Sequence, residues 1–322
     1  MSKATKIWLI VAAVLVLVGI IVAGGAMMAL EWNFSQLSTV KYQTVTHNID
    51  DDFSDISILT DTADVTIRPS EDSRVRVVCT EQKNLKHSVS VKDGVLYVKL
   101  EDTRKWYEHI QIGFNFNTDR ITVYLPVGEY GALSVVTDTG YVEIAKDFTF
   151  SDISVSASTG DIKCFADAQN AIKIKASTGA ISVQGVEARS LDLHVSAGNV
   201  NASGIAVTDS LTLRVTTGRA TLTDVTCHSF TSHGDTGDIS LKSVIVTDKM
   251  HVERDTGDVK FDACDAGEIF VKTDTGDVTG TLLSEKIFIP NSDTGHISVP
   301  KTLTGGRCEI ITDTGDIRIK LK

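Results

Sequence analysis

Residues 211–225 read LTLRVTTGRATLTDV, and this stretch decides the fold. Apolar residues occupy alternate positions on both sides of one glycine, namely Leu211, Leu213 and Val215 before Gly218 and Ala220 and Leu222 after it. Such alternation is typical of a short strand with one buried face. Because glycine adopts backbone angles that other residues resist, the Thr-Gly step predicts a corner between two strands.

A glycine in this pattern occurs ten times at intervals of 19 or 20 residues, nine times after threonine and once, at Gly198, after alanine. The ten are Gly140, Gly160, Gly179, Gly198, Gly218, Gly237, Gly257, Gly276, Gly295 and Gly315. A partial copy, TDTADVTI at 60–67, has Ala63 in the glycine position. One coil cannot bury its own apolar edge, so neighbouring coils must stack through parallel sheets. An immunoglobulin-like sandwich also has alternating strands, but it does not predict ten similar corners. We therefore expect an all-β protein, a single-stranded parallel β-solenoid of about ten coils of 19–20 residues.

An apolar segment near the N-terminus, IWLIVAAVLVLVGIIVAGGAMMAL at 7–30, has no charged side chain. About 20 apolar residues span the hydrocarbon core of a bilayer. A cleaved signal peptide is the alternative, but its apolar region is shorter. Lys3 and Lys6 precede the segment, and the next basic residue is Lys41. The positive-inside rule therefore predicts a single-pass membrane protein with a cytoplasmic N-terminus and an extracytoplasmic C-terminal part.

The expected organisation is a cytoplasmic tail (1–6), a transmembrane helix (7–30), a linker (31–39), an irregular β region (40–132) and the regular repeats (133–322). Residues 102–119, DTRKWYEHIQIGFNFNTD, interrupt the strand rhythm and predict a protruding loop or hairpin. Its aromatic residues, Trp106, Tyr107, Phe114 and Phe116, are candidates for a binding surface. The alternative is that they cover the open apolar end of the solenoid.

Three sequence features together resemble a known family: VKDGVLYVKL, then ITVYLPVGEYGALSVVTDTGYVEI, then the serial STGDI and DTGDV steps. The chain is similar to the bacterial β-strand-repeat "putative adhesin" family, a domain of unknown function found in Gram-positive bacteria. The resemblance covers residues 40–322. It implies a solenoid outside the membrane, behind one N-terminal helix, and it supplies no catalytic residues. Some relatives are similar to accessory proteins of cell-envelope stress systems.

The Asp-Thr-Gly tripeptide is also the signature of aspartic proteases, which need two such aspartates sharing one proton. Here it alternates with Ser-Thr-Gly, Ser-Ala-Gly and Thr-Thr-Gly from corner to corner, so it indicates a turn. The aspartates form two columns along one edge, and those of the C-terminal half are weak Ca²⁺ candidates: Asp235, Asp238, Asp255, Asp258, Asp274, Asp277, Asp313 and Asp316. We expect hydrogen bonds within each turn to satisfy them, and we expect no catalytic residue, no cofactor and no dedicated metal site.

The cysteines and histidines show no recognisable site in the sequence. The five cysteines, Cys79, Cys164, Cys227, Cys264 and Cys308, include no CxxC pair and no zinc-like spacing with histidine, and we expect all of them to be unpaired. His194, His228, His233, His251 and His296 are scattered and are expected on the surface.

The net charge of −11 argues against nucleic-acid binding. The sequence thus predicts a non-catalytic surface binding or scaffold module of the cell envelope, with an envelope polymer, a surface ligand or a membrane protein as its partner. The alternative is an accessory protein of an envelope stress response that acts on a membrane signalling partner. A carbohydrate-active solenoid enzyme is the third possibility, and no carboxylate pair stands out from the repeat to support it.

Overall fold

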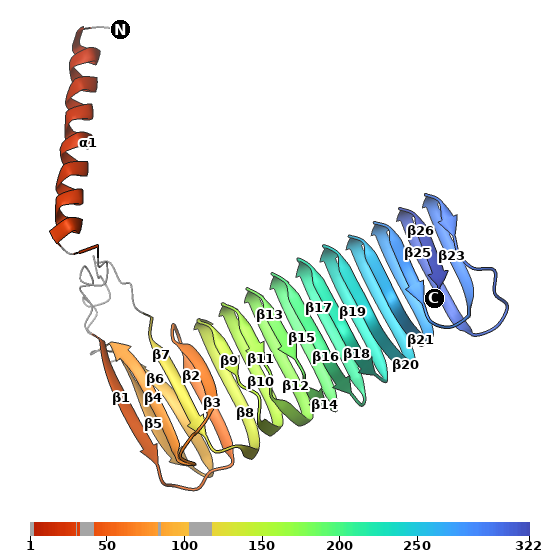
Figure 1. Cartoon of the computed structure of the whole chain (residues 1–322), viewed down its shortest axis with the longest axis horizontal. Coiled ribbons are helices and arrows are strands. Elements are labelled where there is room, and N and C mark those ends of the chain that lie inside the picture. Colours follow the sequence, from red (N-terminus) through yellow and green to blue (C-terminus); the bar gives the residue numbers. More distant parts are fainter. Residues whose placement is uncertain (1–2, 30, 33–41, 83–84, 103–117) are drawn as a thin grey trace.

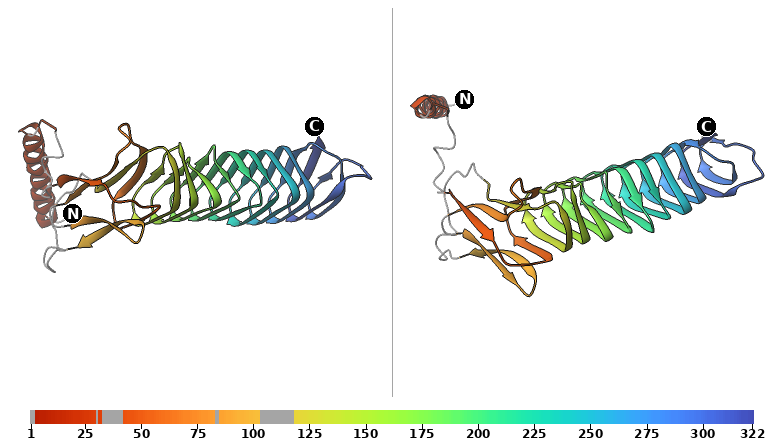
Figure 2. Two further views of the ribbon diagram at one scale, coloured as in Figure 1. Left: turned by 90° about the horizontal axis from the view of Figure 1, so that it is seen from below. Right: turned by 60° about the horizontal axis from the view of Figure 1, so that its bottom comes forward.

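The computed structural model describes residues 3–29, 31–32, 42–82, 85–102 and 118–322. In this part of the chain one helix, α1 (Lys3–Ala29), precedes 26 strands that belong to one continuous sheet. The sheet winds into a long rod (Figure 1, Figure 2). Residues Thr5–Ala29 of α1 are long and apolar enough to cross a membrane, and their side chains are exposed. The expected all-β solenoid behind one apolar helix is confirmed.

The rod is built from short strands that stack in parallel, coil upon coil. Most of it consists of β8 (Gly128–Thr139), β9 (Val142–Ile144), β10 (Phe148–Thr159), β11 (Ile162–Cys164), β12 (Asp167–Thr178), β13 (Ile181–Gln184), β14 (Glu187–Ala188), β15 (Ser190–Ala197), β16 (Val200–Val207), β17 (Ser210–Thr217), β18 (Ala220–Cys227), β19 (Ser229–Thr236), β20 (Ile239–Thr256), β21 (Val259–Thr275) and β22 (Val278–Leu282). In each coil the strand before the Thr-Gly corner lies in one wall of the rod, and the strand after it lies in another.

The corner glycines are required by the stacking of the coils. Gly218 has φ +140°, and a Cβ built on it would lie only 1.8 Å from the carbonyl oxygen of Gly198 in the preceding coil. Its N–H donates to the carbonyl of Thr236 in the following coil at 2.9 Å. A side chain at this corner would therefore separate coils that a backbone hydrogen bond holds together.

Equivalent positions of successive coils form columns of buried side chains. One such column runs through Ile172, Leu191, Leu211, Phe230 and Met250, which pair with one another in register and are all at most 1% exposed. The columns merge into a single apolar core that extends along the rod. All five cysteines are buried free thiols, as expected from the sequence.

The first coil carries the partial repeat, and the regular stack begins on it. This coil contains β2 (Asp55–Thr60) and β3 (Asp64–Pro69), which pair in parallel with β8 and β9. On the other side, β6 (Val95–Asp102) and β7 (Arg120–Leu125) add a further parallel layer. Antiparallel strands then cover this end, namely β1 (Tyr42–Ile49), β4 (Val75–Gln82) and β5 (Leu85–Lys92).

The order of the coils changes at the other end. The last coil in the sequence contains β25 (Gly306–Thr314) and β26 (Ile317–Leu321), and it lies between β21–β22 and the coil of β23 (Lys286–Thr294) and β24 (Ile297–Ser298). The coil at the end of the rod is therefore not the last one in the sequence. The last coil, β25–β26, lies between it and the coil of β21–β22 (Figure 1). Ile297 is 39% exposed, whereas the equivalent Ile162 is fully buried, because no described coil follows.

Candidate functional site

The aspartates that follow the corner glycines form a ladder of hydrogen bonds along the rod. Oδ1 of Asp238 accepts from the backbone N–H of Asp258 at 3.1 Å, and Oδ1 of Asp258 accepts from that of Asp277 at 2.9 Å. In the next two steps Oδ1 of Asp277 accepts from the backbone N–H of Asp316 at 2.8 Å, and Oδ1 of Asp316 accepts from that of His296 at 2.6 Å. The expectation of hydrogen bonds within each turn was therefore wrong for these residues, since each of these bonds joins two coils.

The reason for the ladder is the direction of the backbone at the corner. The N–H groups on either side of this position, such as those of Gly218 and Ala220, donate to carbonyls of the following coil. The intervening N–H of Arg219 points to the preceding coil, where it meets Oδ1 of Asn199 at 2.9 Å. An Asp or Asn side chain thus supplies an acceptor for the one backbone N–H of the corner that points to the preceding coil.

The second group of Ca²⁺ candidates lies two residues before each glycine. Asp235, Asp255 and Asp313 are exposed, and Asp274 is half-buried with Lys272 at 3.3 Å. Of all the residues described, only Cys79, Glu81 and His87 bring three potential metal ligands within 4.8 Å of one another. The acidic corner therefore shows no such grouping among the described residues, and the expectation of at most weak Ca²⁺ binding there stays a prediction.

A shallow groove of about 250 Å³ crosses the outer face of three neighbouring strands, β20, β21 and β25. We call it the His251–Phe270 groove, because these two rings stack in it with their centroids 4.7 Å apart. Charged side chains line it as well, among them Lys249, Glu268, Arg307 and Glu309. The groove therefore combines an apolar stacking surface with groups that can form hydrogen bonds.

Two of the histidines that the sequence showed as scattered share one carboxylate, namely His251, which lines the groove, and His233 on the neighbouring strand β19. Nε2 of His251 lies 2.9 Å from Oε1 of Glu253, and Nδ1 of His233 lies 3.0 Å from Oε2. Burial raises the pKa of Glu253, but the hydrogen bonds and charges of His251 and His233 outweigh it and hold this pKa below its usual range. One signal was present in the sequence: His233 and Glu253 each lie four residues before a corner glycine, Gly237 and Gly257, which places them in one column.

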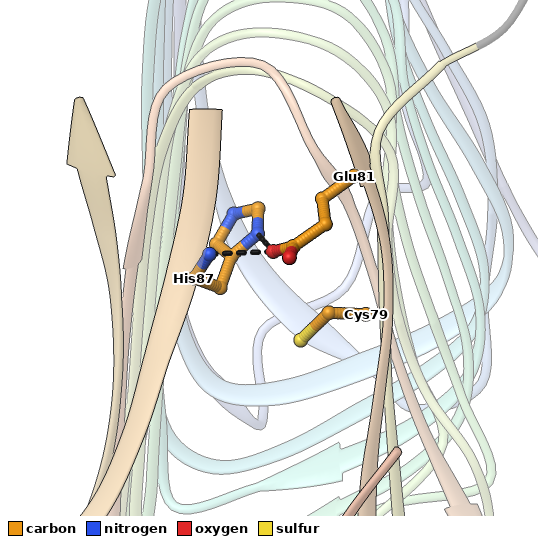
Figure 3. A group of neighbouring side chains, drawn as sticks. All are labelled: Cys79, Glu81 and His87. Atoms are coloured by element: carbon orange, nitrogen blue, oxygen red, sulfur yellow. Dashed lines mark hydrogen bonds and ion pairs between the residues drawn. The ribbon is translucent and has the colours of Figure 1, made fainter. Parts of the chain in front are cut away.

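A second cluster is buried at the other end of the rod, between its two walls. Cys79 and Glu81 lie on β4 with one residue between them, so both side chains point to the same face. His87 lies on β5, and its Nδ1 is 3.2 Å from Oε2 of Glu81 (Figure 3). The three residues are at most 4% exposed. We call this the Cys79–Glu81–His87 cluster.

Further polar groups orient this cluster. The backbone N–H of His87 donates to Oε2 of Glu81 at 2.6 Å, and the side-chain amide of Gln43 donates to Oε1 at 3.3 Å. On the far side of the ring, Nε2 of His87 lies 3.2 Å from Oγ1 of Thr60. The Glu81 carboxylate and the imidazole are therefore held in place from two sides.

Burial governs the ionisation of two neighbouring groups. It raises the pKa of the Cys79 thiol to about 12, and the charge of Glu81 adds to this effect. Burial also raises the pKa of Asp119, against the opposing effects of His87, Thr62 and Gln82. Oδ1 of Asp119 has no hydrogen-bond partner among the described residues. At neutral pH Cys79 is thus a thiol and not a nucleophilic thiolate.

The sequence analysis missed this cluster, because its members are joined by tertiary pairing. One signal was present: in VRVVCTE at 75–81 the strand alternation places Cys79 and Glu81 on the same face. Nothing in the sequence showed that His87 would face them from the opposite wall. The aromatic candidates Trp106, Tyr107, Phe114 and Phe116 lie outside the described residues.

Several solved structures match most of this chain at low sequence identity. A crystal structure of a putative adhesin from Parabacteroides merdae has 16% sequence identity and a TM-score of 0.48, over 88% of this chain and 98% of the other. Putative adhesins from Bacteroides fragilis (14%, TM-score 0.41) and Parabacteroides distasonis (12%, TM-score 0.44) match 87% of this chain each, and 97% and 98% of their own chains. None of the curated proteins matches.

The family itself is shown by the sequence pattern of Toastrack DUF4097, which matches residues 53–229 and 206–322. Together the two matches extend from the first coil to the last. The chain therefore belongs to the Toastrack DUF4097 family.

Proposed function

We propose that this protein is a membrane-anchored, extracytoplasmic and non-catalytic binding module that holds a surface ligand on the side of its rod. The single observation that carries this proposal is the His251–Phe270 groove. A half-buried pair of stacked rings such as His251 and Phe270, next to charged side chains, is typical of binding surfaces, where the rings supply contact area and the polar groups supply orientation. We expect the ligand to be a polymer of the cell envelope, because the groove is open and shallow.

The arrangement of the chain supports this proposal. α1 is suited to anchoring the N-terminus, with Lys3 and Lys6 on the cytoplasmic side by the positive-inside rule. The groove lies on the coils around Gly257 and Gly276, roughly 35 Å along the rod from the first coil at a spacing of about 4.8 Å per coil. A rigid rod of this kind would present the groove away from its own N-terminal end.

Several observations argue against catalysis in the described part of the chain. The Asp-Thr-Gly aspartates alternate with other residues at equivalent corners, and those after the glycines accept hydrogen bonds from neighbouring coils. Cys79 is a protonated thiol, and Glu253 is paired with two histidines. None of these groups is poised as a nucleophile with an adjacent general base.

A co-sedimentation experiment tests the proposal with the full chain in detergent micelles and purified cell-wall polysaccharide. We expect the wild type to bind and the His251→Ala/Phe270→Ala double variant to lose at least tenfold in affinity. Tyr97→Ala is the matched control, because it removes a half-buried aromatic ring from the outer face of β6 at the other end of the rod. Equal binding by the double variant and the wild type would exclude the His251–Phe270 groove as the binding surface for the polymer. Absence of polymer binding by the wild type would contradict the proposal and favour the envelope-stress alternative.

A further inference from the structure

We propose that the Cys79–Glu81–His87 cluster is a Zn²⁺ site that fastens the two walls of the rod at its N-terminal end. The proposal does not depend on the proposed function. It rests on the geometry of three buried side chains and on one buried carboxylate oxygen beside them.

The donor set matches the preferences of zinc. Thiolate, imidazole and carboxylate are its three usual protein ligands, with bonds of roughly 2.0–2.3 Å. Two ligands at such distances in a tetrahedral arrangement lie roughly 3.3 Å apart. Nδ1 of His87 and Oε2 of Glu81 are separated by 3.2 Å. Sγ of Cys79 lies within 4.8 Å of one ring nitrogen of His87 and of one carboxylate oxygen of Glu81. Bringing the thiol into the coordination sphere therefore requires only a small side-chain adjustment.

The surrounding groups hold the ligands in the orientation that coordination needs. If His87 binds the metal through Nδ1, its Nε2–H is free to donate to Oγ1 of Thr60, 3.2 Å away. Metal-binding histidines usually make such an outer hydrogen bond, which selects the tautomer. Glu81 uses Oε2 for the metal and keeps the Gln43 amide on Oε1. The outer partners Thr60 and Gln43 are thus retained, while the metal replaces the direct contact between Nδ1 of His87 and Oε2 of Glu81.

Asp119 is the independent observation that points to a cation. Its carboxyl group is 4% exposed, it lies close enough to His87 to interact with the charge of the ring, and its Oδ1 has no hydrogen-bond partner in the described structure. A buried carboxylate needs compensation by a charge or by hydrogen bonds. Glu81 is a second buried carboxyl group, and its Oε2 lies 3.2 Å from Nδ1 of the same imidazole. A divalent cation at the cluster would provide such compensation.

Zinc would act here as a structural element. Cys79 and Glu81 come from the wall that contains β4, β7 and β3, whereas His87 comes from the wall that contains β5, β6 and β2. Binding of the metal would replace the proton of the Cys79 thiol, which passes to solvent, and would connect the antiparallel strands that cover this end.

The test uses the full chain in detergent, stripped of metal with a chelator and titrated with Zn²⁺ alone. We expect one Zn²⁺ per chain, release of one proton from the thiol, and a higher melting temperature with the metal. Titration with Co²⁺ should produce a thiolate-to-cobalt charge-transfer band. This band needs no variant, so it reports on Cys79 even where a substitution impairs folding.

Variants separate a site from adventitious binding. We expect Cys79→Ser to abolish the cobalt band and His87→Gln to weaken Zn²⁺ binding more than 100-fold, whereas Thr60→Val should weaken it about tenfold by removing the outer hydrogen bond. Cys227→Ser is the matched control, since Cys227 is also a buried free thiol but lies outside the cluster. Absence of Zn²⁺ uptake by the wild type, or equal uptake by Cys79→Ser and the wild type, would overturn the proposal.

Discussion

The guanidinium group of Arg254 occupies the space that a side chain at Gly234 would need. A Cβ built on Gly234 would lie 1.5 Å from Nη1 of Arg254 and 2.5 Å from the carbonyl oxygen of Val215. The two residues pair in register on β19 and β20, and Arg254 is 2% exposed inside the rod. Burial lowers the pKa of Arg254 to about 10, which indicates that its charge is held in an unfavourable place.

Gly234→Ala should destabilise the rod, because the added methyl group collides with both Arg254 and the backbone. We expect the free energy of unfolding to fall by about 1–3 kcal/mol, the usual effect of overpacking a core. Chemical denaturation measures this change. Gly128→Ala is the control, because a Cβ there meets no atom within 4 Å. Equal stability of the two variants would show that Arg254 does not need the space.

Arg254→Met should leave the free energy of unfolding unchanged or raise it by up to about 2 kcal/mol, although it removes two hydrogen bonds. Nη2 of Arg254 donates to Ser232 at 2.9 Å and Nη1 donates to Val215 at 3.4 Å, but Nε has no partner among the described residues. An apolar side chain of similar length avoids the desolvation of the charge. Arg254→Ala should instead lower the stability by about 2–5 kcal/mol through the cavity it leaves. A loss of that size in Arg254→Met would contradict this view.

Asp258→Ala should lower the free energy of unfolding by about 1 kcal/mol, because the N–H of Asp277 loses its acceptor. Asp258→Asn should be close to neutral, since the amide oxygen of Asn199 already plays this part for Arg219. Asp255→Ala is the control on the neighbouring column, where the exposed side chain should contribute less than about 0.5 kcal/mol. The ladder would lose its proposed role if Asp258→Ala and Asp255→Ala had the same effect in urea titrations.

Asp265 should make the C-terminal end of the rod sensitive to acid. Its carboxylate lies 2.7 Å from Nζ of the buried Lys286, and Ser284 donates to it at 2.8 Å. Burial raises the pKa of Asp265, but the Lys286 and Ser284 contacts outweigh it and the pKa is lowered overall. Its contribution to stability is therefore present above the unfolded pKa of about 3.9 and is lost as the pH falls through the lower folded value.

The measurement is the melting temperature between pH 6 and pH 2 for the wild type and two variants. Asp265→Asn should be less stable at neutral pH, because Lys286 keeps its buried charge without the partner, and it should lose less on acidification than the wild type. Asp262→Asn, at an exposed position of the same strand, should follow the wild-type curve. Parallel curves for Asp265→Asn and the wild type would rule out Asp265 as the source of the acid sensitivity.

Ca²⁺ should have only a small effect on the acidic edge. The aspartates after the glycines already accept backbone hydrogen bonds, and those before the glycines do not gather in threes. We expect millimolar Ca²⁺ to raise the melting temperature by less than about 5 °C, which corresponds to roughly 2 kcal/mol for a chain of this size. A larger rise, absent with Mg²⁺, would identify a Ca²⁺ site at Asp235–Asp316.

The repeat made the regular part of the rod predictable from sequence. Each corner contains its own glycine and its own alternating apolar residues, so the copy around Gly218 predicted both its strands and its stacking partners. The partial copy at Ala63 was predictable for the same reason, and the structure places it directly against the Gly140 coil. The local sequence pattern determines the local structure here, because each coil contacts only its two neighbours and does so through the same positions.

The candidate sites were less predictable. The positions of the histidines relative to the corner glycines were visible in the sequence. Only the pairing of β19 with β20, however, shows that His233, His251 and Glu253 lie together. The Cys79–Glu81–His87 cluster required the pairing of opposite walls. Such contacts depend on which strands face one another, and a periodic sequence with many equivalent strands does not specify that.

The sequence by itself determined the all-β class, the coil length, the corner glycines and the apolar helix at the N-terminus. Only the tertiary structure decided the order of the last two coils, the direction of the aspartate hydrogen bonds and the buried cluster at the first end. The physical reason is the similarity of the repeats. Any coil can stack on any other through the same backbone hydrogen bonds, so the choice between neighbours depends on non-repeated contacts, such as that of Lys286 with Asp265, which form only once the rod is assembled.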